Sequence, residues 1–406
     1  MKLIKYTTVG GILLMLASFI WMGSSSDSPQ PCFLVVSDVH LNEQQHMYSA
    51  YNGSGDAGYD LWGAAKDKIA SILKDRKPSF ILLLGDLPMH HALPADSDMA
   101  KSEISSVINS LKFIASEHNI PLIYAPGNND IPGHHNGVFS ASHFRAYTDT
   151  DNPDQWAMAF GNVQYPANGR LSDLGYYSVW PLADHKLRVI VLNTVTYLSK
   201  TNDTSQFIWL RSQLRNAQGL GEKVLITMHV PPGSSYDGKA SWRKADVCLQ
   251  EVFIRSIEPY RRSIVGILTS HTHKEGIKVY QDSQGKPMDI GLSIPGIAPG
   301  HGNYPAMELV SYDSSFKLED VFTFYHTYSA DSVTDQTNIT KWGDQSISFI
   351  RDIVHRPSGT SLSDLIISSA PDSVIAWQRR TETILNEAGP KRYDSPKVVS
   401  VTDGCE

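Results

Sequence analysis

The chain has 406 residues, of which 41% are hydrophobic and 19% charged, so it can bury one large core or two smaller ones. This composition excludes a disordered or fibrous protein. The formal net charge of −7, with no basic cluster beyond short pairs such as Arg261-Arg262, argues against a protein whose main task is to grip duplex nucleic acid or an anionic membrane.

Residues 1 to 26 have the layout of a secretory signal. Lys2 and Lys5 precede an apolar stretch from Val9 to Met22, and small residues follow it. Because a membrane-spanning helix needs about 20 apolar residues, the shorter stretch favours cleavage near Gly23 to Ser26, with an uncleaved anchor as the alternative. We therefore expect a secreted or periplasmic protein that keeps no membrane span after cleavage.

Three cysteines, Cys32, Cys248 and Cys405, are too few for a disulfide scaffold and badly spaced for a zinc knuckle. An oxidising compartment permits one disulfide bond, and a bond between Cys32 and Cys405 would tie the mature amino end to the tail. Three cysteines allow three pairings, so the sequence leaves the pairing open. Three unpaired thiols are the alternative.

Five apolar runs, each typical of a buried strand, end on residues that can bind a metal ion. The runs and their ends are Phe33 to Asn42 with Asp38 and His40, Phe80 to Leu84 before Asp86, Leu122 to Ala125 before Asn128, Val224 to Met228 before His229, and Ile264 to Leu268 before His271 and His273. One such ending is common in any protein, but five in order indicate a single site.

Helical spacing separates these strands. The three apolar faces are Leu61, Ala65, Ile69, Ile72 and Leu73, then Ile104, Val107, Ile108, Leu111 and Ala115, then Phe207, Leu210, Leu214 and Ala217. Strand and helix alternate from Phe33 to Ser270, which predicts an α/β fold with mostly parallel central strands. In such sheets, ligands bind beyond the carboxyl ends of the strands.

Residues 134 to 181 interrupt this alternation with a stretch rich in Gly, Asn and aromatic residues. The pattern predicts a long excursion over the sheet. Its aromatic side chains either form a rim near the substrate or cover a small satellite core.

After Pro299, Met307 to Tyr312 and Leu318 to Tyr325 predict a pair of strands joined by a turn. The capping pattern Ser361 to Asp364 predicts the start of one helix, and a second is expected from Asp372 to a stop at Gly389-Pro390. We take residues 27 to 325 as the main, catalytic domain and residues 326 to 406 as a C-terminal helical extension packed on it.

The five strand ends provide two carboxylates, one amide oxygen and four imidazoles. Seven such ligands exceed what one tetrahedral zinc ion takes, and they suit a two-metal centre in which one carboxylate, Asp86, bridges the ions. Two divalent ions about 3.5 to 4 Å apart would lower the pKa of a shared water and neutralise phosphoryl oxygens during in-line attack. The set therefore predicts phosphoester hydrolysis rather than acyl transfer.

The order Asp-x-His, Gly-Asp, Gly-Asn-Asn-Asp, His, His-x-His resembles the calcineurin-like metallophosphoesterase superfamily. Longer segments resemble its acid sphingomyelinase-like phosphodiesterase branch: GDLPMHH (85–91), LNTVTYLSK (192–200), QFIWL (206–210), MHVPPG (228–233) and MELVSYD (307–313). The similarity spans Phe33 to Tyr325, most of the mature chain.

This resemblance implies two packed mixed β-sheets flanked by helices, in four α/β/β/α layers, and a metal pair that is usually zinc. Nitrogen and oxygen ligands would also accept manganese or iron. His90 falls where the branch carries the histidine of its GDxxxH motif, so the resemblance implies that it protonates the leaving group, because an alkoxide leaves poorly otherwise. The implied ligands are Asp38, His40, Asp86 and His273 for one ion, and Asp86, Asn128, His229 and His271 for the other.

Two positions depart from the branch pattern. Asn129 stands where the branch usually has a histidine that is a second candidate proton donor; asparagine can hydrogen-bond a phosphoryl oxygen but cannot supply a proton. Either the GDxxxH histidine acts alone, or His91, His134 or His135 substitutes, or only substrates with good leaving groups react. Ser270 replaces the usual glycine, which should be tolerated if its backbone is not at positive φ.

Three functions remain open. The first is a secreted phosphodiesterase acting on a phosphocholine-type lipid headgroup or a nucleotide phosphoester. The second is an endopolyphosphatase or a phosphatase of nucleotides and monoesters from the same superfamily. The third is a non-catalytic metal-binding relative, which Asn129 favours and the seven intact ligands oppose. Oligomeric state is left open.

Overall fold

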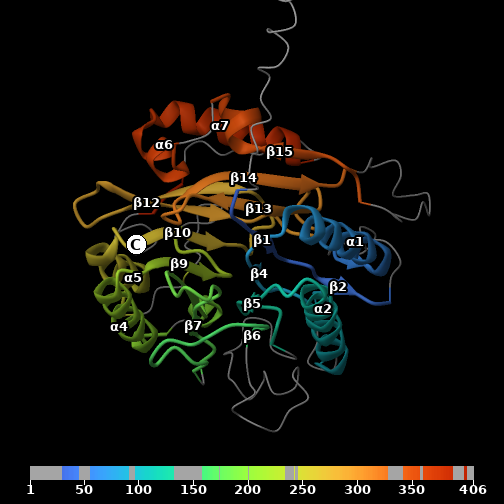
Figure 1. Ribbon diagram of the computed structural model, residues 1–406, viewed down its shortest axis with the longest axis horizontal. Coiled ribbons are helices and arrows are strands. Elements are labelled where there is room, and N and C mark those ends of the chain that lie inside the picture. The colour runs from blue at the N-terminus through green and yellow to red at the C-terminus, as the bar shows by residue number, and fades with distance from the viewer. Residues whose placement is uncertain are drawn as a thin grey trace, which may run out of the picture. The chain divides into compact units, whose positions relative to one another are not determined.

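The computed structural model describes residues 30–44, 55–90, 97–131, 158–172, 174–199, 201–233, 242, 246–327, 342–356, 360–386 and 397–399. The chain divides into two units, Met1–Gln30 and Pro31–Glu406. The predicted signal segment, residues 1 to 26, lies outside the described residues. Within Pro31–Glu406, two seven-stranded sheets stand between two pairs of helices (Figure 1). The predicted fold class of two mixed sheets with flanking helices is confirmed.

The first sheet contains strands from both ends of the described chain. Its order is β15 (Ser346–Ser348), β14 (Leu318–Tyr325), β13 (Ala306–Tyr312), β1 (Cys32–Val36), β4 (Ile81–Leu83), β5 (Leu122–Tyr124) and β6 (Ala159–Phe160). The three strands β1, β4 and β5 are parallel, with Val36 opposite Leu83 and Leu83 opposite Tyr124. This register brings their carboxyl ends to one edge of the sheet.

The second sheet repeats this arrangement. Its order is β16 (Lys397–Val399), β11 (Gly276–Gln281), β12 (Pro287–Ser293), β10 (Ile264–Thr269), β9 (Lys223–Met228), β8 (Leu187–Leu192) and β7 (Tyr177–Val179). Strands β8, β9, β10 and β12 are parallel. A separate parallel pair, β2 (Leu41–Asn42) with β3 (Ala57–Gly58), follows directly after β1.

Four helices cover the outer faces of the sheets (Figure 1): α1 (Tyr59–Arg76) and α2 (Ser97–Glu117) beside the first, α4 (Ser205–Leu220) and α5 (Leu249–Ile257) beside the second. Every residue of the three predicted apolar faces is buried. Short 3-10 turns at η4 (Val195–Leu198) and η5 (Glu258–Tyr260) connect these layers. The helices therefore form where the 3.6-residue period of apolar residues predicts them.

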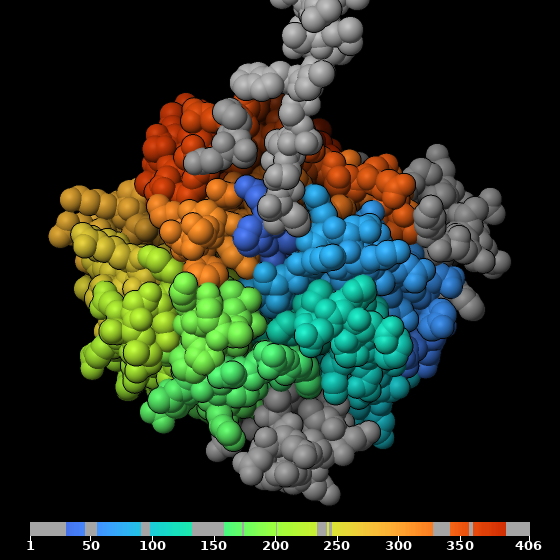
Figure 2. Space-filling model, viewed as in Figure 1, coloured from blue at the N-terminus to red at the C-terminus, as the bar shows by residue number. Residues whose placement is uncertain are grey.

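The C-terminal extension contains more than helices. It holds a π-helix (η7, Phe349–Val354), then α6 (Leu362–Ser368) and α7 (Pro371–Leu385), and its strands β15 and β16 add an edge to each sheet. The predicted cap is confirmed, because Ser361 Oγ accepts a 3.1 Å hydrogen bond from the Asp364 amide. Figure 2 shows this extension, in red, lying against the orange strands, and α6 packs on β14 and β12. Helix α7 ends before the predicted stop, and Gly389-Pro390 lies outside the described residues.

The predicted excursion over 134 to 181 also contributes to the sheets. Residues 132–157 lie outside the described part of the chain, but β6 and β7 give each sheet an edge strand. Tyr177 is fully buried, and its hydroxyl lies 2.7 Å from the carbonyl oxygens of Tyr124 and Met158. Tyr177 therefore packs in the core and does not form part of a rim near the substrate.

The state of the cysteines differs from both alternatives that the sequence suggested. Cys32 is a free, buried thiol on β1, so a bond between Cys32 and Cys405 is wrong, as is the alternative of three free thiols. Cys248, directly before α5, is disulfide-bonded, and Cys405 lies outside the described residues. Among the helices of the described ranges, none has both the length and the apolar character needed to span a membrane.

Candidate metal centre

The seven candidate ligands come from both sheets and meet between them. Four follow β1, β4 and β5 of the first sheet, and three follow β9 and β10 of the second. All are buried except His271, which is partly exposed. The carboxyl ends of parallel strands from both sheets thus bring together residues more than 200 positions apart, such as His40 and His273, whose Nε2 atoms are 3.1 Å apart.

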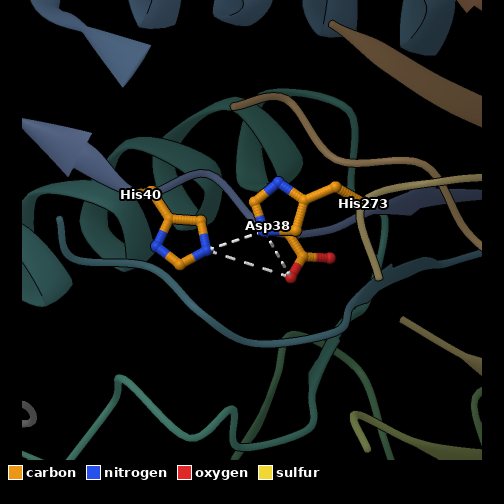
Figure 3. A group of neighbouring side chains, drawn as sticks. All are labelled: Asp38, His40 and His273. Atoms are coloured by element: carbon orange, nitrogen blue, oxygen red, sulfur yellow. Dashed lines mark hydrogen bonds and ion pairs between the residues drawn. The ribbon is translucent and has the colours of Figure 1, made fainter. Parts of the chain in front are cut away.

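The first group consists of Asp38, His40 and His273 (Figure 3). His40 Nδ1 donates to the Pro88 carbonyl and His273 Nδ1 to the Ala298 carbonyl, both at 3.1 Å. A carbonyl can only accept, so in each neutral ring Nδ1 carries the hydrogen and Nε2 presents a lone pair.

Three acceptor atoms therefore converge in this group. His273 Nε2 and His40 Nε2 lie 3.5 and 4.0 Å from Asp38 Oδ1, which has no hydrogen-bond partner within the described structure. Burial raises the pKa of Asp38 to about 7, so its ionised form needs a positive charge nearby. The donor set fits a divalent cation, because a single bound cation would satisfy three buried acceptors at once.

The second group consists of Asp86, His229 and His271, with Asn128 beside them. His229 Nε2 lies 3.2 Å from Asp86 Oδ2 and 3.1 Å from Asn128 Oδ1, while its Nδ1 donates to the Leu84 carbonyl at 2.6 Å. Burial alone would lower the pKa of His229, but the Asp86 carboxylate raises it to about 9. The position at Nε2 thus attracts a cation, either a proton or a metal ion that displaces it.

Asp86 connects the two groups. Its Oδ2 lies 3.5 Å from His40 Nε2 in the first group and 3.2 Å from His229 Nε2 in the second. Burial would raise the pKa of Asp86, but the imidazole of His229 holds it well below its usual value. An ionised carboxylate between two sets of imidazoles is the geometry that a bridging ligand requires.

The ligand backbones are unusual. Five ligands have left-handed φ: Asp38 at 46°, His40 at 43°, Asp86 at 54°, His271 at 74° and His273 at 58°. Each such non-glycine residue costs about 1–3 kcal/mol and persists only where the surrounding structure imposes it. Their concentration in one place is typical of a functional site.

A second feature joins the Gly-Asp and Gly-Asn-Asn-Asp turns. Gly85 has φ +83°, and a Cβ there would lie 2.3 Å from the Gly127 nitrogen, so only glycine lets these two backbones touch. Asp130, fully buried, accepts from the amides of Asp86 at 3.0 Å, Leu87 at 2.7 Å and Gly127 at 2.6 Å. The Gly-Asn-Asn-Asp motif includes Asp130 without indicating a role for it. In the structure Asp130 fixes the backbone of Asp86, the candidate bridging ligand.

His90 lies against the first group with a partner that the sequence did not indicate. Its ring stacks on His40 with centroids 4.0 Å apart and planes 8° apart, and its Nδ1 lies 2.6 Å from Asp56 Oδ1. Burial alone would lower the pKa of His90, but the hydrogen bond and charge of Asp56 raise it above the usual value. Asp56 is buried beside β3, where the Ala57 amide donates to the His40 carbonyl at 2.9 Å. No motif marks Asp56, and only the β2–β3 pairing brings it to His90.

The two residues that depart from the branch pattern, Asn129 and Ser270, both have hydrogen-bond partners in the structure. Asn129 donates its backbone amide to Asp86 Oδ1 and its side-chain amide to Asp86 Oδ2, each at 2.8 Å. Ser270 is not among the residues with positive φ, and its hydroxyl donates to the Leu84 carbonyl at 2.8 Å, so the change from glycine is tolerated as expected. The other candidate proton donors, His91, His134 and His135, lie outside the described residues.

Comparison with known proteins identifies the family of this chain. Residues 33–275, more than half of the chain, match the model of the calcineurin-like phosphoesterases. The chain belongs to this family. It therefore carries a phosphoesterase domain, as the order of the motifs predicted.

The relatives of this phosphoesterase are named phosphodiesterases. It is 29% identical to human cyclic GMP-AMP phosphodiesterase SMPDL3A, over 72% of this chain and 70% of that protein. It is 27% identical to mouse acid sphingomyelinase-like phosphodiesterase 3b, over 61% and 57%, and 24% identical to Caenorhabditis elegans sphingomyelin phosphodiesterase 2, over 70% and 45%. The matches thus span from under half to 70% of those relatives. A solved dimetal phosphatase from Danio rerio aligns with a TM-score of 0.43 and 13% identity, over 73% of this chain and 95% of that one.

Proposed function

We propose that this phosphoesterase is an extracytoplasmic phosphodiesterase that works with two divalent metal ions, zinc before manganese or iron, on small phosphocholine-type or nucleotide substrates. The observation that carries the proposal is Asp86 Oδ2, which lies within 3.5 Å of an imidazole nitrogen of each ligand group. Relatives named as phosphodiesterases of sphingomyelin and of cyclic GMP-AMP support diesters as the substrate class.

The geometry above supports the division of the candidate ligands between two ions. Asp38, His40, Asp86 and His273 would hold one, and Asp86, Asn128, His229 and His271 the other. A pair of divalent cations, when bound, offsets the charge of phosphoryl oxygens and acidifies water. Carbonyl partners at Nδ1 of His40, His229 and His273 keep each ring in the tautomer whose Nε2 can bind.

His90 is the proton donor of this proposal. Its side chain is 34% exposed, so a leaving group can reach it, whereas that of Asp56 behind it is 2% exposed. With Nδ1 engaged by Asp56, Nε2 of the imidazolium is the atom left to give a proton to a departing alkoxide. Asp56 stabilises the charged ring and fixes its plane against His40.

The compartment is proposed on two grounds. Residues 1 to 26 have the pattern of a secretory signal, and Cys248 is disulfide-bonded, which is typical of proteins in oxidising compartments. Since Cys32 is free and the sequence has only one other cysteine, non-reducing peptide mapping of secreted protein should link Cys248 to Cys405. Recovery of Cys248 as a free thiol would argue against this location.

Hydrolysis assays test the proposal directly. The mature protein, loaded with zinc, is compared on bis(p-nitrophenyl) phosphate and p-nitrophenyl phosphate, with and without chelator. Faster cleavage of the diester that chelator abolishes and zinc restores supports it. A panel of sphingomyelin, CDP-choline, cyclic GMP-AMP, ATP and polyphosphate then separates diesterase from phosphatase and endopolyphosphatase. Two bound ions per chain with no turnover of any substrate would instead favour the non-catalytic relative.

A further inference from the structure

A loop behind the first ligand group reaches it through its backbone. The Ala298 carbonyl accepts from His273 Nδ1 at 3.1 Å, and the Ala298 amide donates to the Asp38 carbonyl at 2.9 Å. The neighbouring Ile297 amide donates to the Ser37 carbonyl at 3.0 Å. One short segment, residues 296–298, therefore sets both the ring of His273 and the backbone of Asp38.

Gly296 lies close to both ligands. A Cβ added to Gly296 would lie 3.0 Å from Asp38 Cβ and 3.1 Å from His273 Cγ, closer than ordinary contacts, so a side chain there would push against both residues. A shift of a few tenths of an ångström in the loop is thus transmitted to the two ligands, because close-packed interiors pass displacement on rather than absorb it.

Asn303 holds this segment by hydrogen bonds to its carbonyl oxygens. Its side-chain amide lies 3.1 Å from the Ala298 carbonyl and 3.3 Å from those of Gly296 and Tyr304, and the residue is 1% exposed. Asn303 and His273 thus donate to the same carbonyl, that of Ala298, which fixes the direction in which the His273 ring faces.

The C-terminal helix α7 holds Asn303 in turn. The Tyr304 amide donates to the Leu385 carbonyl at 2.8 Å, and a backbone bridge joins Asn303 to Asn386. Residues at the end of α7, including Leu385, line a small cavity together with Asn303 and His273. The extension is therefore connected to the centre by a continuous set of contacts.

We propose that Asn303 is a positioning residue for the metal ion on the Asp38, His40 and His273 side, and that α7 keeps it in place. This inference rests on the proposed two-metal centre. A different carbonyl orients the second group, because His229 Nδ1 donates to Leu84. Loss of Asn303 should therefore lower the affinity for one ion and leave the affinity for the other unchanged.

Zinc stoichiometry and affinity, measured by chelator competition on the full chain, test this without reference to turnover. Removal of outer partners of metal ligands typically weakens binding about 10–100-fold. We expect Asn303→Ala and Asn303→Asp to lower the affinity for one of the two zinc ions by this factor. Adding Asn303→Ala to His273→Ala should have little further effect, because both changes act on the same ion.

Leu365→Ala is the matched control, because Leu365 is an equally buried leucine of the same extension, on α6. Leu365→Ala should lower the unfolding temperature and leave both zinc affinities unchanged. Leu385→Ala should weaken the binding of one zinc ion, because the lost side chain enlarges the cavity that Leu385 lines with Asn303 and His273. If the Asn303 variants do not fold, the comparison of Leu385→Ala with Leu365→Ala decides. Folded variants that keep two ions with wild-type affinity would overturn the inference, while a wild-type chain that binds fewer than two ions would refute the metal centre itself.

Discussion

The pairing of Asp56 with His90 gives a prediction whose size follows from the structure. Their 2.6 Å hydrogen bond is buried on the Asp56 side and joins a carboxylate to an imidazole. A bond of this charge-assisted kind contributes about 1.5–3 kcal/mol, and a neutral bond about half as much. At a pH above the His90 pKa the fraction of imidazolium limits a reaction that needs the His90 proton. Asp56→Asn keeps an acceptor oxygen, so there it should slow the reaction about 4–10-fold, and Asp56→Ala about 10–100-fold.

The assay compares leaving groups. Alkyl phosphodiesters need a proton on the departing oxygen, whereas p-nitrophenyl esters do not, so only the former should slow in kcat while KM and two-ion binding stay unchanged. His90→Ala should show the same selectivity more strongly, and adding Asp56→Ala to it should change little. Asp67→Asn, an exposed carboxylate on α1, is the control. Equal slowing of both ester types by Asp56→Ala would refute the reasoning.

Three further changes test other parts of the site and core. Asp86→Asn should remove metal and activity together, with at least the roughly 100-fold loss of affinity that outer partners alone can cause; full zinc content would contradict the bridging role. Asn129→His should speed alkyl esters, toward the roughly 100-fold scale of general acid catalysis if proton donation limits, and an unchanged rate would mean that His90 suffices. Burial raises the pKa of Glu308, opposite Glu275, well above its usual value. The contribution of Glu308 to stability is therefore full below its usual pKa of 4.5 and is lost as pH rises toward the raised pKa. Glu308→Gln should flatten by a few degrees the fall of the unfolding temperature as pH rises above 4.5, and a curve parallel to that of the wild type would disprove this.

Much of the fold could be predicted because local pattern and tertiary structure agree. Apolar residues at helical spacing formed α1, α2 and α4, and the runs that end on ligands formed β1, β4, β5, β9 and β10. The prediction failed where pairing partners are distant. Nothing in Ser346–Ser348 or Lys397–Val399 indicates that these short strands complete two sheets, because an edge strand is selected by the neighbour that it pairs with.

The sequence by itself identified the seven candidate metal ligands, since five apolar runs in order end on oxygen or imidazole side chains. It could not determine how they are held. Asp56 beside His90, Asn303 behind His273 and the left-handed backbone of five ligands depend on contacts between segments far apart in the chain. Such contacts leave no local periodicity, because each is made by a single residue whose partner is supplied only when the two sheets and the C-terminal helix pack together.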